Sequence, residues 1–333
     1  MTVALEIPNT GTARRTLDRT DAWTELGIGV RGAKTAEEAL KSAHLWGWDV
    51  RKIGGVTATE TSGDSMTTVK MPDSYATVRT NPLTGETDYL GTVGRKYVPV
   101  QNEAHAEVLD LLAKESGAVF DRAGAFQGGR KVFLSMQLPQ VLNLGGIDHH
   151  DLNIAVFNSH DGSSASSVHL TPTRLLCGNM QKIAIRGAKY SHSIPHTVSA
   201  EKKITAVHKA LFALFDYREA FEREADRLLN TPMTLGGFEQ LVNKVWPVPT
   251  SPSKRTRTNH LVRVTTLRSL FEDADTQANI RGTAWAAWNA VGEYLDHYAP
   301  AKTGEIRAAR SLSSSGTVTS MKQKAYDLLA LAA

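Results

Sequence analysis

The sequence predicts an α+β protein, with a mostly antiparallel sheet and a crossing helix in its first half and a helical second half. Aromatic and β-branched residues alternate with polar ones between about residues 75 and 170, and turn residues interrupt them. After Pro195 the apolar residues recur at helical spacing instead. Strands followed by a run of helices are typical of the α+β class.

The chain is expected to begin with a flexible arm over residues 1–34, because this segment has few apolar residues. A helix should start after Thr35, which can cap it, with Glu38 placed three residues later as in a capping box. Residues 46–55 then alternate and end in two glycines, which favours a strand. Residues 55–73 are polar throughout, and we expect them to be irregular.

The core domain is expected to span residues 35–198. Residues 75–100 should form a hairpin that turns at Thr84-Gly85. A helix over residues 101–117 should be capped by Asn102 and ended by Gly117. Two strands around the glycines 128–129 follow, then a third over residues 152–162, and Pro172 is expected to end the sheet.

Residues 199–333 are expected to form a helical region packed on that core. Ser199 is a plausible cap for the first helix, and three prolines between residues 246 and 252 indicate a loop. The apolar spacing predicts helices over residues 199–230, 234–245, 257–273, 278–298 and 320–331.

Composition restricts the class of protein. The chain has 333 residues, of which 41% are hydrophobic and 22% charged, as in soluble globular proteins. No apolar run reaches the roughly 18 residues that a membrane span needs, and the N-terminus lacks a signal-like apolar segment. A single cysteine, Cys177, leaves no internal disulfide and suits a reducing cytoplasm, so we expect a cytoplasmic protein without a membrane partner.

Positive charge is unevenly distributed along the chain. Residues 162–200, 240–271 and 306–326 contain Lys and Arg but no Asp or Glu. One such stretch is often only a solvated face. Three of them in one chain favour an anionic partner.

Cys177 is the first candidate for catalysis. A nucleophilic cysteine needs a base nearby, and His169 and His192 are close in sequence, but their spacing matches no cysteine-hydrolase pattern. The apolar neighbours Leu175 and Leu176 favour a buried structural thiol. We therefore expect no catalytic role for it.

Histidines and acids between residues 147 and 162 are the candidates for a metal site. His149 and His150 should point to opposite faces of a strand and so cannot share one ion. Asp148, Asp151 and Asp161 leave open a Mg²⁺-dependent nuclease, although Asp161 also fits an Asp-Gly turn. No GxxxxGK[ST], GxGxxG, GxSxG or HExxH motif occurs, so we expect no catalytic residue, no metal and no cofactor.

Nucleic-acid binding has better support, because basic residues occur beside aromatic ones at the predicted strand ends. Such a rim can follow a phosphate backbone while rings meet bases. Arg95-Lys96 and Arg130-Lys131 are the strongest candidates, since core packing does not require them. The full set of candidate binding residues is Arg51, Lys52, Arg95, Lys96, Tyr97, Arg130, Lys131, Arg174, Lys182, Arg186 and Lys189.

Four blocks of the sequence carry a resemblance to a known family: LGTVGRKYVPVQNEAHAEVLDLL, AGAFQGGRKVFLSMQLP, FNSHDGSS with HLTPTRLLCGNM, and TAWAAWNAVGEYLDHYAP. In this order they resemble the phage/plasmid-like family known as domain of unknown function 932, from about Trp46 to the C-terminus. The family's TPxRVVCxNT block has Leu175-Leu176 and Asn179-Met180 here. The resemblance implies a mobile element in a bacterial host cell and no defined activity.

The antiparallel core is also similar in architecture to phage single-strand annealing proteins, although no motif matches. Together these observations favour a non-enzymatic protein, expected to be a homo-oligomer, that binds or anneals single-stranded DNA in recombination or replication. A protein-interaction or assembly factor of a mobile element is the alternative, and the Mg²⁺-dependent nuclease is a third.

Overall fold

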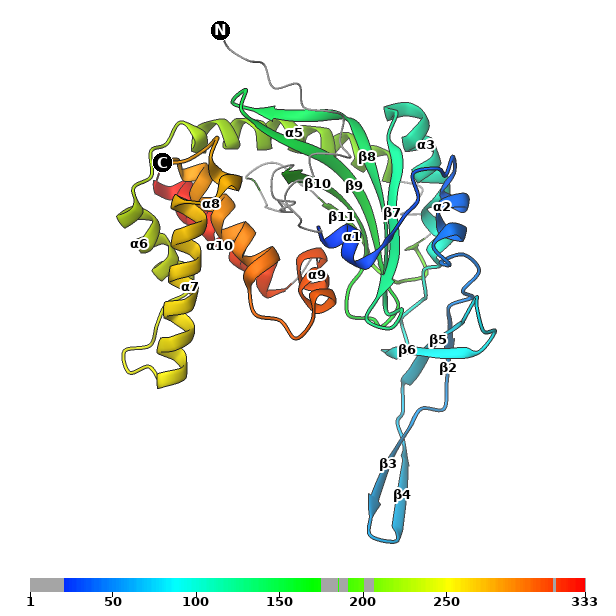
Figure 1. The fold of residues 1–333 in the computed structure, drawn as a ribbon. Coiled ribbons are helices and arrows are strands. Elements are labelled where there is room, and N and C mark those ends of the chain that lie inside the picture. The colour runs from blue at the N-terminus through cyan, green and yellow to red at the C-terminus, as the bar shows by residue number, and fades with distance from the viewer. Residues whose placement is uncertain (1–20, 175–184, 186–190, 201–206, 314–315, 333) are drawn as a thin grey trace.

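The structure is a computed structural model that describes residues 21–174, 185, 191–200, 207–313 and 316–332 (Figure 1). It has an antiparallel sheet region followed by helices, which confirms the predicted α+β class. No helix within these residues is long and apolar enough to cross a membrane.

The main sheet has six strands in the order β1-β7-β8-β9-β10-β11, and every neighbouring pair is antiparallel. It was predicted from the alternating residues, but β8 and β9 are longer than expected. The strands are β1 (Ile28–Gly29), β7 (Val119–Phe126), β8 (Lys131–Leu144), β9 (Asp148–Ser159), β10 (Ser166–Arg174) and β11 (Ser191–Ile194).

The prediction that Pro172 ends the sheet was wrong, because β10 continues to Arg174 and Pro172 pairs with Leu152 of β9. Within the described residues, β11 pairs with β10 only from Ser166 to His169. A proline is tolerated at an edge that needs no backbone N–H.

Helices α2 (Ala36–Ser42) and α3 (Ala106–Ser116) lie against the β7 side of the sheet (Figure 1). Thr35 caps α2 as predicted, with its hydroxyl accepting from the Glu38 backbone N–H at 3.2 Å. Gly117 ends α3 with φ +71°, a left-handed conformation that favours glycine. Asn102 was wrongly predicted as a cap. It begins the 3-10 turn η1 (Asn102–His105), and its side-chain amide donates to the Leu45 carbonyl at 2.8 Å instead.

The second half is helical, as predicted, and packs on the sheet. The prediction missed α9, whose N-cap is Thr303, and placed the start of α7 three residues late, since Ser253 caps it. The elements are α5 (Val207–Leu229), α6 (Leu235–Val245), α7 (Lys254–Glu272), η2 (Asp275–Gln277), α8 (Ala284–Glu293), η3 (Tyr294–Tyr298), α9 (Gly304–Leu312) and α10 (Thr317–Ala332).

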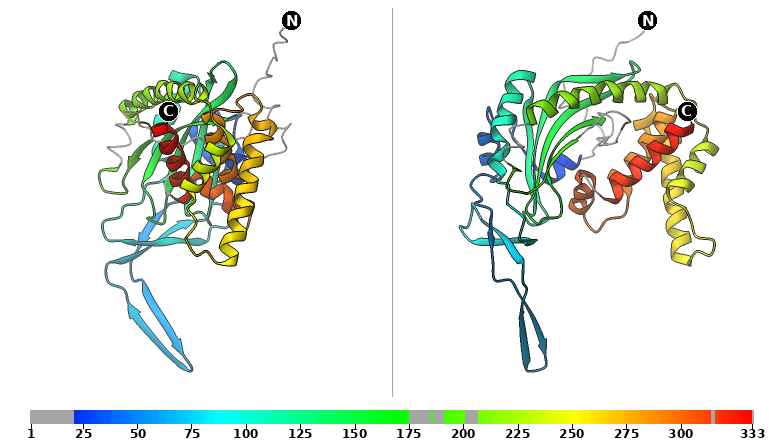
Figure 2. Two further views of the ribbon diagram at one scale, coloured as in Figure 1. Left: turned by 90° about the vertical axis from the view of Figure 1, so that its left-hand side faces the viewer. Right: turned by 180° about the vertical axis from the view of Figure 1, so that it is seen from behind.

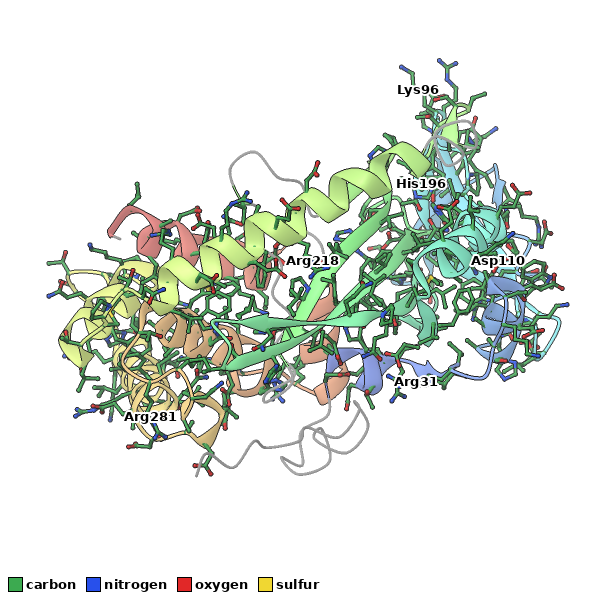
Figure 3. The ribbon with its side chains drawn as sticks, turned by 90° about the horizontal axis from the view of Figure 1, so that it is seen from above. Arg31, Lys96, Asp110, His196, Arg218 and Arg281 are labelled. Carbon is green, nitrogen blue, oxygen red and sulfur yellow. The ribbon has the colours of Figure 1, made fainter. Side chains whose placement is uncertain are left out.

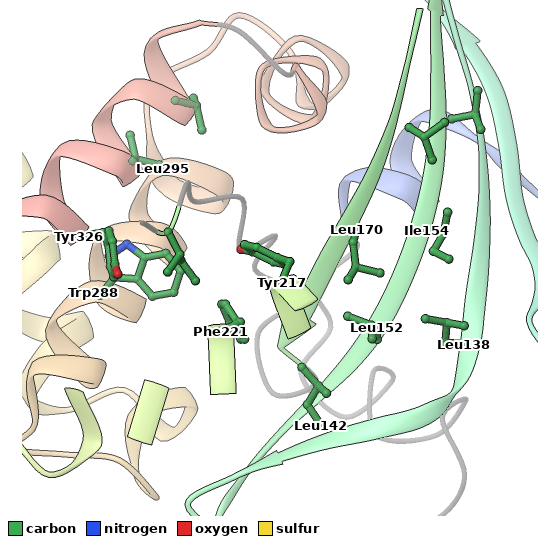
Figure 4. Close-up of a cluster of buried hydrophobic side chains, with 14 of the residues drawn as sticks. Leu138, Leu142, Leu152, Ile154, Leu170, Tyr217, Phe221, Trp288, Leu295 and Tyr326 are labelled. Carbon is green, nitrogen blue, oxygen red and sulfur yellow. The ribbon is translucent and has the colours of Figure 1, made fainter. Parts of the chain in front are cut away.

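One hydrophobic core joins the sheet to the helices. Leu152, Ile154 and Leu170 of the sheet face Tyr217 and Phe221 of α5, and the core continues to α8 and α10 (Figure 4). Every residue of α8 is buried. This shared apolar core holds the helical region on the sheet.

The predicted flexible arm over residues 1–34 does not hold for residues 21–34. Helix α1 (Ala22–Leu26) buries Trp23 to 1% exposure, with ring centroids 5.3 Å from Phe133 and 5.7 Å from Phe157. One tryptophan with two aromatic partners anchors a short segment that the low apolar content did not suggest. Residues 1–20 lie outside the described part of the chain.

The polar segment predicted to be irregular is in fact a regular hairpin of β3 (Thr57–Ser62) and β4 (Ser65–Lys70), which turns at Gly63-Asp64. All of its strand residues are exposed. Because neither face of the hairpin is buried, its sequence shows no alternation of apolar and polar residues. The β-branched threonines were the remaining indication of strands.

Strands β2 (Arg51–Ile53), β5 (Ser74–Thr80) and β6 (Thr87–Gly94) form a separate three-stranded sheet, which contains the predicted hairpin. The β3–β4 hairpin and helix α7 both project from the body on the same side (Figures 1 and 2). Helix α7 has no buried residue before Leu267, and its first two turns are mostly exposed.

Candidate nucleic-acid interface

The structure brings the two strongest candidate pairs to the same end of the main sheet. Arg130-Lys131 lie where the β7–β8 turn enters β8, and Arg95-Lys96 lie in the turn after β6. Tyr97 connects the two turns, since its hydroxyl donates to the Ser159 carbonyl at 2.9 Å and Ser159 pairs with Lys131. Basic residues that are 35 positions apart in the sequence therefore share one surface.

These four cations are available to a partner. Arg95, Lys96 and Arg130 are exposed and Lys131 is half-buried. Within the described residues none of the four side chains makes a hydrogen bond or an ion pair, although the positive charge of Lys131 acts on the nearby carboxylate of Asp161. Lys96 lies at one extreme of the molecule when the structure is seen from above (Figure 3).

Three other candidates have partners inside the protein. Lys52 donates to the carbonyls of Arg95 at 2.7 Å and Tyr97 at 2.9 Å, which fixes the turn that carries Arg95-Lys96. Arg51 binds Asp49, Thr80 and Thr87 across the small sheet. Tyr97 stacks on His196 with ring centroids 4.8 Å apart, so its ring already has a stacking partner. These residues support the surface from within.

The remaining four candidates cannot be placed on this surface. The backbone of Arg174 ends β10, but its side chain lies outside the described part of the structure. The same holds for Lys182, Arg186, Lys189 and Cys177, which lie outside the described residues.

The small sheet is held tightly against the end of the main sheet. The Thr77 hydroxyl donates to the His160 carbonyl at 2.6 Å, and a Cβ added to Gly91 would lie 2.6 Å from the Asp161 Cα. Backbone at that distance leaves no room for any side chain, so only glycine fits there. This contact fixes the Arg95-Lys96 turn relative to Arg130-Lys131.

A network of buried histidines lies beneath the basic surface. His160 bonds through Nε2 to the Asn102 side-chain oxygen at 2.9 Å, and His105 bonds through Nε2 to the Ser166 hydroxyl at 2.7 Å. His196 stacks on Tyr97. The Trp48 ring lies against His160, with Arg79 over it at 3.9 Å. This network was not predicted from the sequence, because its three histidines come from three separate segments.

All three histidines are kept neutral by burial. Desolvation lowers the pKa of His105 to about 4, that of His160 to about 3 and that of His196 to about 4. The charge of His196 lowers the pKa of the other two further, and Arg79 also acts on His160. The nearby Asp161 only partly offsets this for His160 and His196. The network is thus built from neutral rings.

The Asp161 carboxylate has a structural role at the end of β9. It accepts from the Ser159 hydroxyl at 2.6 Å and the Ser163 N–H at 2.9 Å, and Gly162 follows with φ +76°. Hydrogen bonds from Ser159 and Ser163, together with Lys131, lower its pKa despite partial burial. This is the Asp-Gly turn that the sequence analysis gave as the alternative to a metal-binding role for Asp161.

The three acids of the nuclease hypothesis do not come together. Asp148 begins β9 and Asp161 follows its other end, so at about 3.3 Å per residue they lie tens of ångströms apart. Asp148 is buried, accepting from the Trp285 indole N–H at 2.7 Å and from Asn279 at 3.3 Å. His150 is buried and His149 is partly exposed, which confirms that they point to opposite faces.

Metal ligands are not grouped within the described residues, where no three His, Cys, Asp or Glu side chains are placed to hold an ion. The acid-free stretch 306–326 differs from the basic surface, although Arg310 is exposed. Each of its cations has a partner: Arg307 and Arg310 donate to the carbonyls of Ala299 and Pro300, Lys322 to Asp296, and Lys324 to Val245.

One family model matches the chain, over residues 89–315, and its description is "Domain of unknown function (DUF932)". The match runs from β6 to the residues after α9, so it includes both turns of the basic surface, the main sheet and most of the helices. No curated protein and no solved structure matches the chain.

Proposed function

Since this chain belongs to the family of domain of unknown function 932, whose description assigns no activity, we propose from its geometry that it binds single-stranded nucleic acid, with single-stranded DNA as the expected strand. One observation carries the proposal: Arg95, Lys96, Arg130 and Lys131 share one surface and have no partners among the described residues. Four cations at one sheet end that make no hydrogen bond or ion pair among the described residues suit a phosphate backbone.

The mechanism is electrostatic and non-covalent. Each cation that neutralises a phosphate releases condensed counterions, which lowers the logarithm of the affinity by about 0.7 per tenfold rise in salt on single strands. Lys52 and the buried network hold the two turns in place, so these turns lose little conformational entropy on binding. Phosphate contacts leave base edges free to pair, as annealing in recombination or replication requires.

The first prediction replaces Arg95, Lys96, Arg130 and Lys131 with alanine. At 0.1 M salt each lost contact removes about 0.7 log units, so affinity for a labelled single-stranded oligonucleotide should fall on the order of 10²-fold or more. The slope of log affinity against log salt should become less negative by about 3. Fluorescence anisotropy over a salt series measures both quantities.

A matched control removes the same charge elsewhere. Lys34, Lys41, Lys114 and Arg223 are exposed and lie on helices α2, α3 and α5 or just before them. Replacing these four with alanine should leave the affinity within about threefold, through net charge alone. Equal weakening by both quadruple variants would reject a specific basic surface.

A second candidate function, assembly into a homo-oligomer, has support from the β3–β4 hairpin. Its strands are exposed throughout, including Met66 at 72% and Val69 at 59%. An isolated two-stranded hairpin is marginally stable in water, and its free edges can pair with another strand. A second copy of the chain would supply such a strand.

The second prediction replaces residues 57–70 with a short Gly-Ser linker. The midpoint of urea unfolding should not change, because no buried residue is removed. The mass measured by light scattering should fall from a multiple of 36.2 kDa towards that of a single chain. Identical masses for the two proteins would exclude the hairpin as the contact between copies.

A further inference from the structure

A pocket of about 620 Å³ lies among the helices, and it is within the size range of small-ligand sites. Its walls come from the end of α6 and from α7, η3, α9 and α10. Gln127 of the β7–β8 turn forms part of the wall. That turn also carries Arg130, so the pocket adjoins the proposed basic surface.

Arg263 of α7 gives the pocket its chemistry. Its guanidinium lies 5.3 Å from the centre of the Trp246 ring, and Tyr294 packs edge-on against the same ring at 5.7 Å. The Nε atom of Arg263 is buried and makes no hydrogen bond, and within the described residues no carboxylate pairs with the group. A partly buried guanidinium with an unbonded Nε and no counter-charge is stabilised when a ligand supplies an anion.

The rest of the lining defines the kind of anion. Arg310 is exposed at the pocket, and within the described residues its one internal hydrogen bond runs from a guanidinium nitrogen to the Pro300 carbonyl at 3.0 Å. The lining has one carboxylate, the exposed Glu305, against the two arginines, so the net charge of the pocket is positive. Leu295, Ile306, Val318 and Met321 are apolar. A guanidinium fork binds phosphate oxygens in pairs, and an apolar wall suits an organic body attached to them.

We propose that this pocket binds a phosphorylated end of the nucleic-acid strand: the terminal phosphate at Arg263 and Arg310, and the sugar and base along the apolar wall. The proposal rests on the proposed function. A terminal phosphomonoester carries about −1.5 to −2 charges, against −1 for an internal phosphodiester, so it suits the unpaired arginine better. The strand would reach the pocket from Arg130 across the β7–β8 turn.

The experiment compares four forms of one oligonucleotide, with a 5′-phosphate, a 3′-phosphate, both or neither, by fluorescence anisotropy. One phosphorylated end should bind about tenfold or more tighter than the unphosphorylated strand, and the 5′ and 3′ forms show which end enters. Arg263→Gln should abolish this difference and leave binding of the unphosphorylated strand within about threefold. Arg263→Lys keeps the charge without the fork and should retain part of it.

Ile306→Trp narrows the pocket from a position that is 37% exposed, so it should also abolish the difference without unfolding the protein, which the urea midpoint checks. Equal, salt-dependent binding of all four oligonucleotides would overturn the pocket proposal and leave the basic surface standing. If no oligonucleotide binds, the proposed function fails. A deoxynucleoside 5′-monophosphate then tests the pocket alone, and lack of its binding, or binding unchanged by Arg263→Gln, overturns the pocket as well.

Discussion

Lys322→Met should destabilise the protein by about 3–5 kcal/mol, because it removes the positive charge that pairs with the buried carboxylate of Asp296. The Lys322 Nζ lies 2.6 Å from the Asp296 Oδ2, and the two side chains are 3% and 4% exposed. Methionine keeps the length of the side chain and removes the charge together with its N–H donors. Urea unfolding at neutral pH gives the free energy of unfolding for both proteins.

The double variant Lys322→Met with Asp296→Asn separates charge from packing. It removes both charges with little change of shape, so it should recover more than half of the lost stability. Lys41→Met breaks the exposed pair with Glu37, where the side chains are 56% and 51% exposed, and should cost about 0.5 kcal/mol or less. A loss below about 1 kcal/mol for Lys322→Met would contradict the prediction.

Lys322 also shows why an acid-free stretch of sequence does not by itself predict an exposed basic surface. Its acid-free neighbourhood looked like a solvated or ligand-binding face, but its counter-charge, Asp296, lies 26 positions earlier on η3. A local window contains no information about a partner brought in by folding. The stretch 240–271 differs, since Lys254, Arg255 and Arg257 on α7 are exposed.

Elements with local signals were predicted well, and features that depend on tertiary contacts were not. The Thr35 cap, the Gly117 stop and the alternating strands are local, and each is found. Trp23 is anchored by rings from β8 and β9, and no local pattern announces that contact. The arm prediction was wrong for residues 21–34 for this reason.

The candidate site divides in the same way. Arg95-Lys96 and Arg130-Lys131 were predicted because paired cations at turns have no role in a core, and folding places both pairs at one sheet end. The histidines beneath them were not predicted, since an isolated histidine in a sequence is more often a satisfied core residue. That these histidines lie together becomes evident only once the small sheet packs against the end of the main sheet.

The protein should lose stability steeply as the pH falls from about 6.5 to 4. His105, His160 and His196 have pKa values of about 4, 3 and 4 in the folded protein, against about 6.5 when unfolded. Between these values the unfolded chain binds more protons than the folded one, so stability rises with pH and is fully present above about 6.5. Each histidine contributes up to about 1.4 kcal/mol per pH unit, or about 4 for three.

Urea unfolding at intervals between pH 4.5 and 7.5 measures this slope. His196→Phe keeps the ring that stacks on Tyr97 and removes the titrating group, so it should reduce the slope by about a third. His44 is exposed and has φ +55°, which asparagine tolerates, so His44→Asn should leave the slope unchanged. Asp161 is not responsible in this range, because its pKa is lowered and its contribution is lost only below about pH 4. A flat profile above pH 4.5 would contradict the prediction, because it would mean that the three rings take up protons as readily in the folded protein as in the unfolded chain.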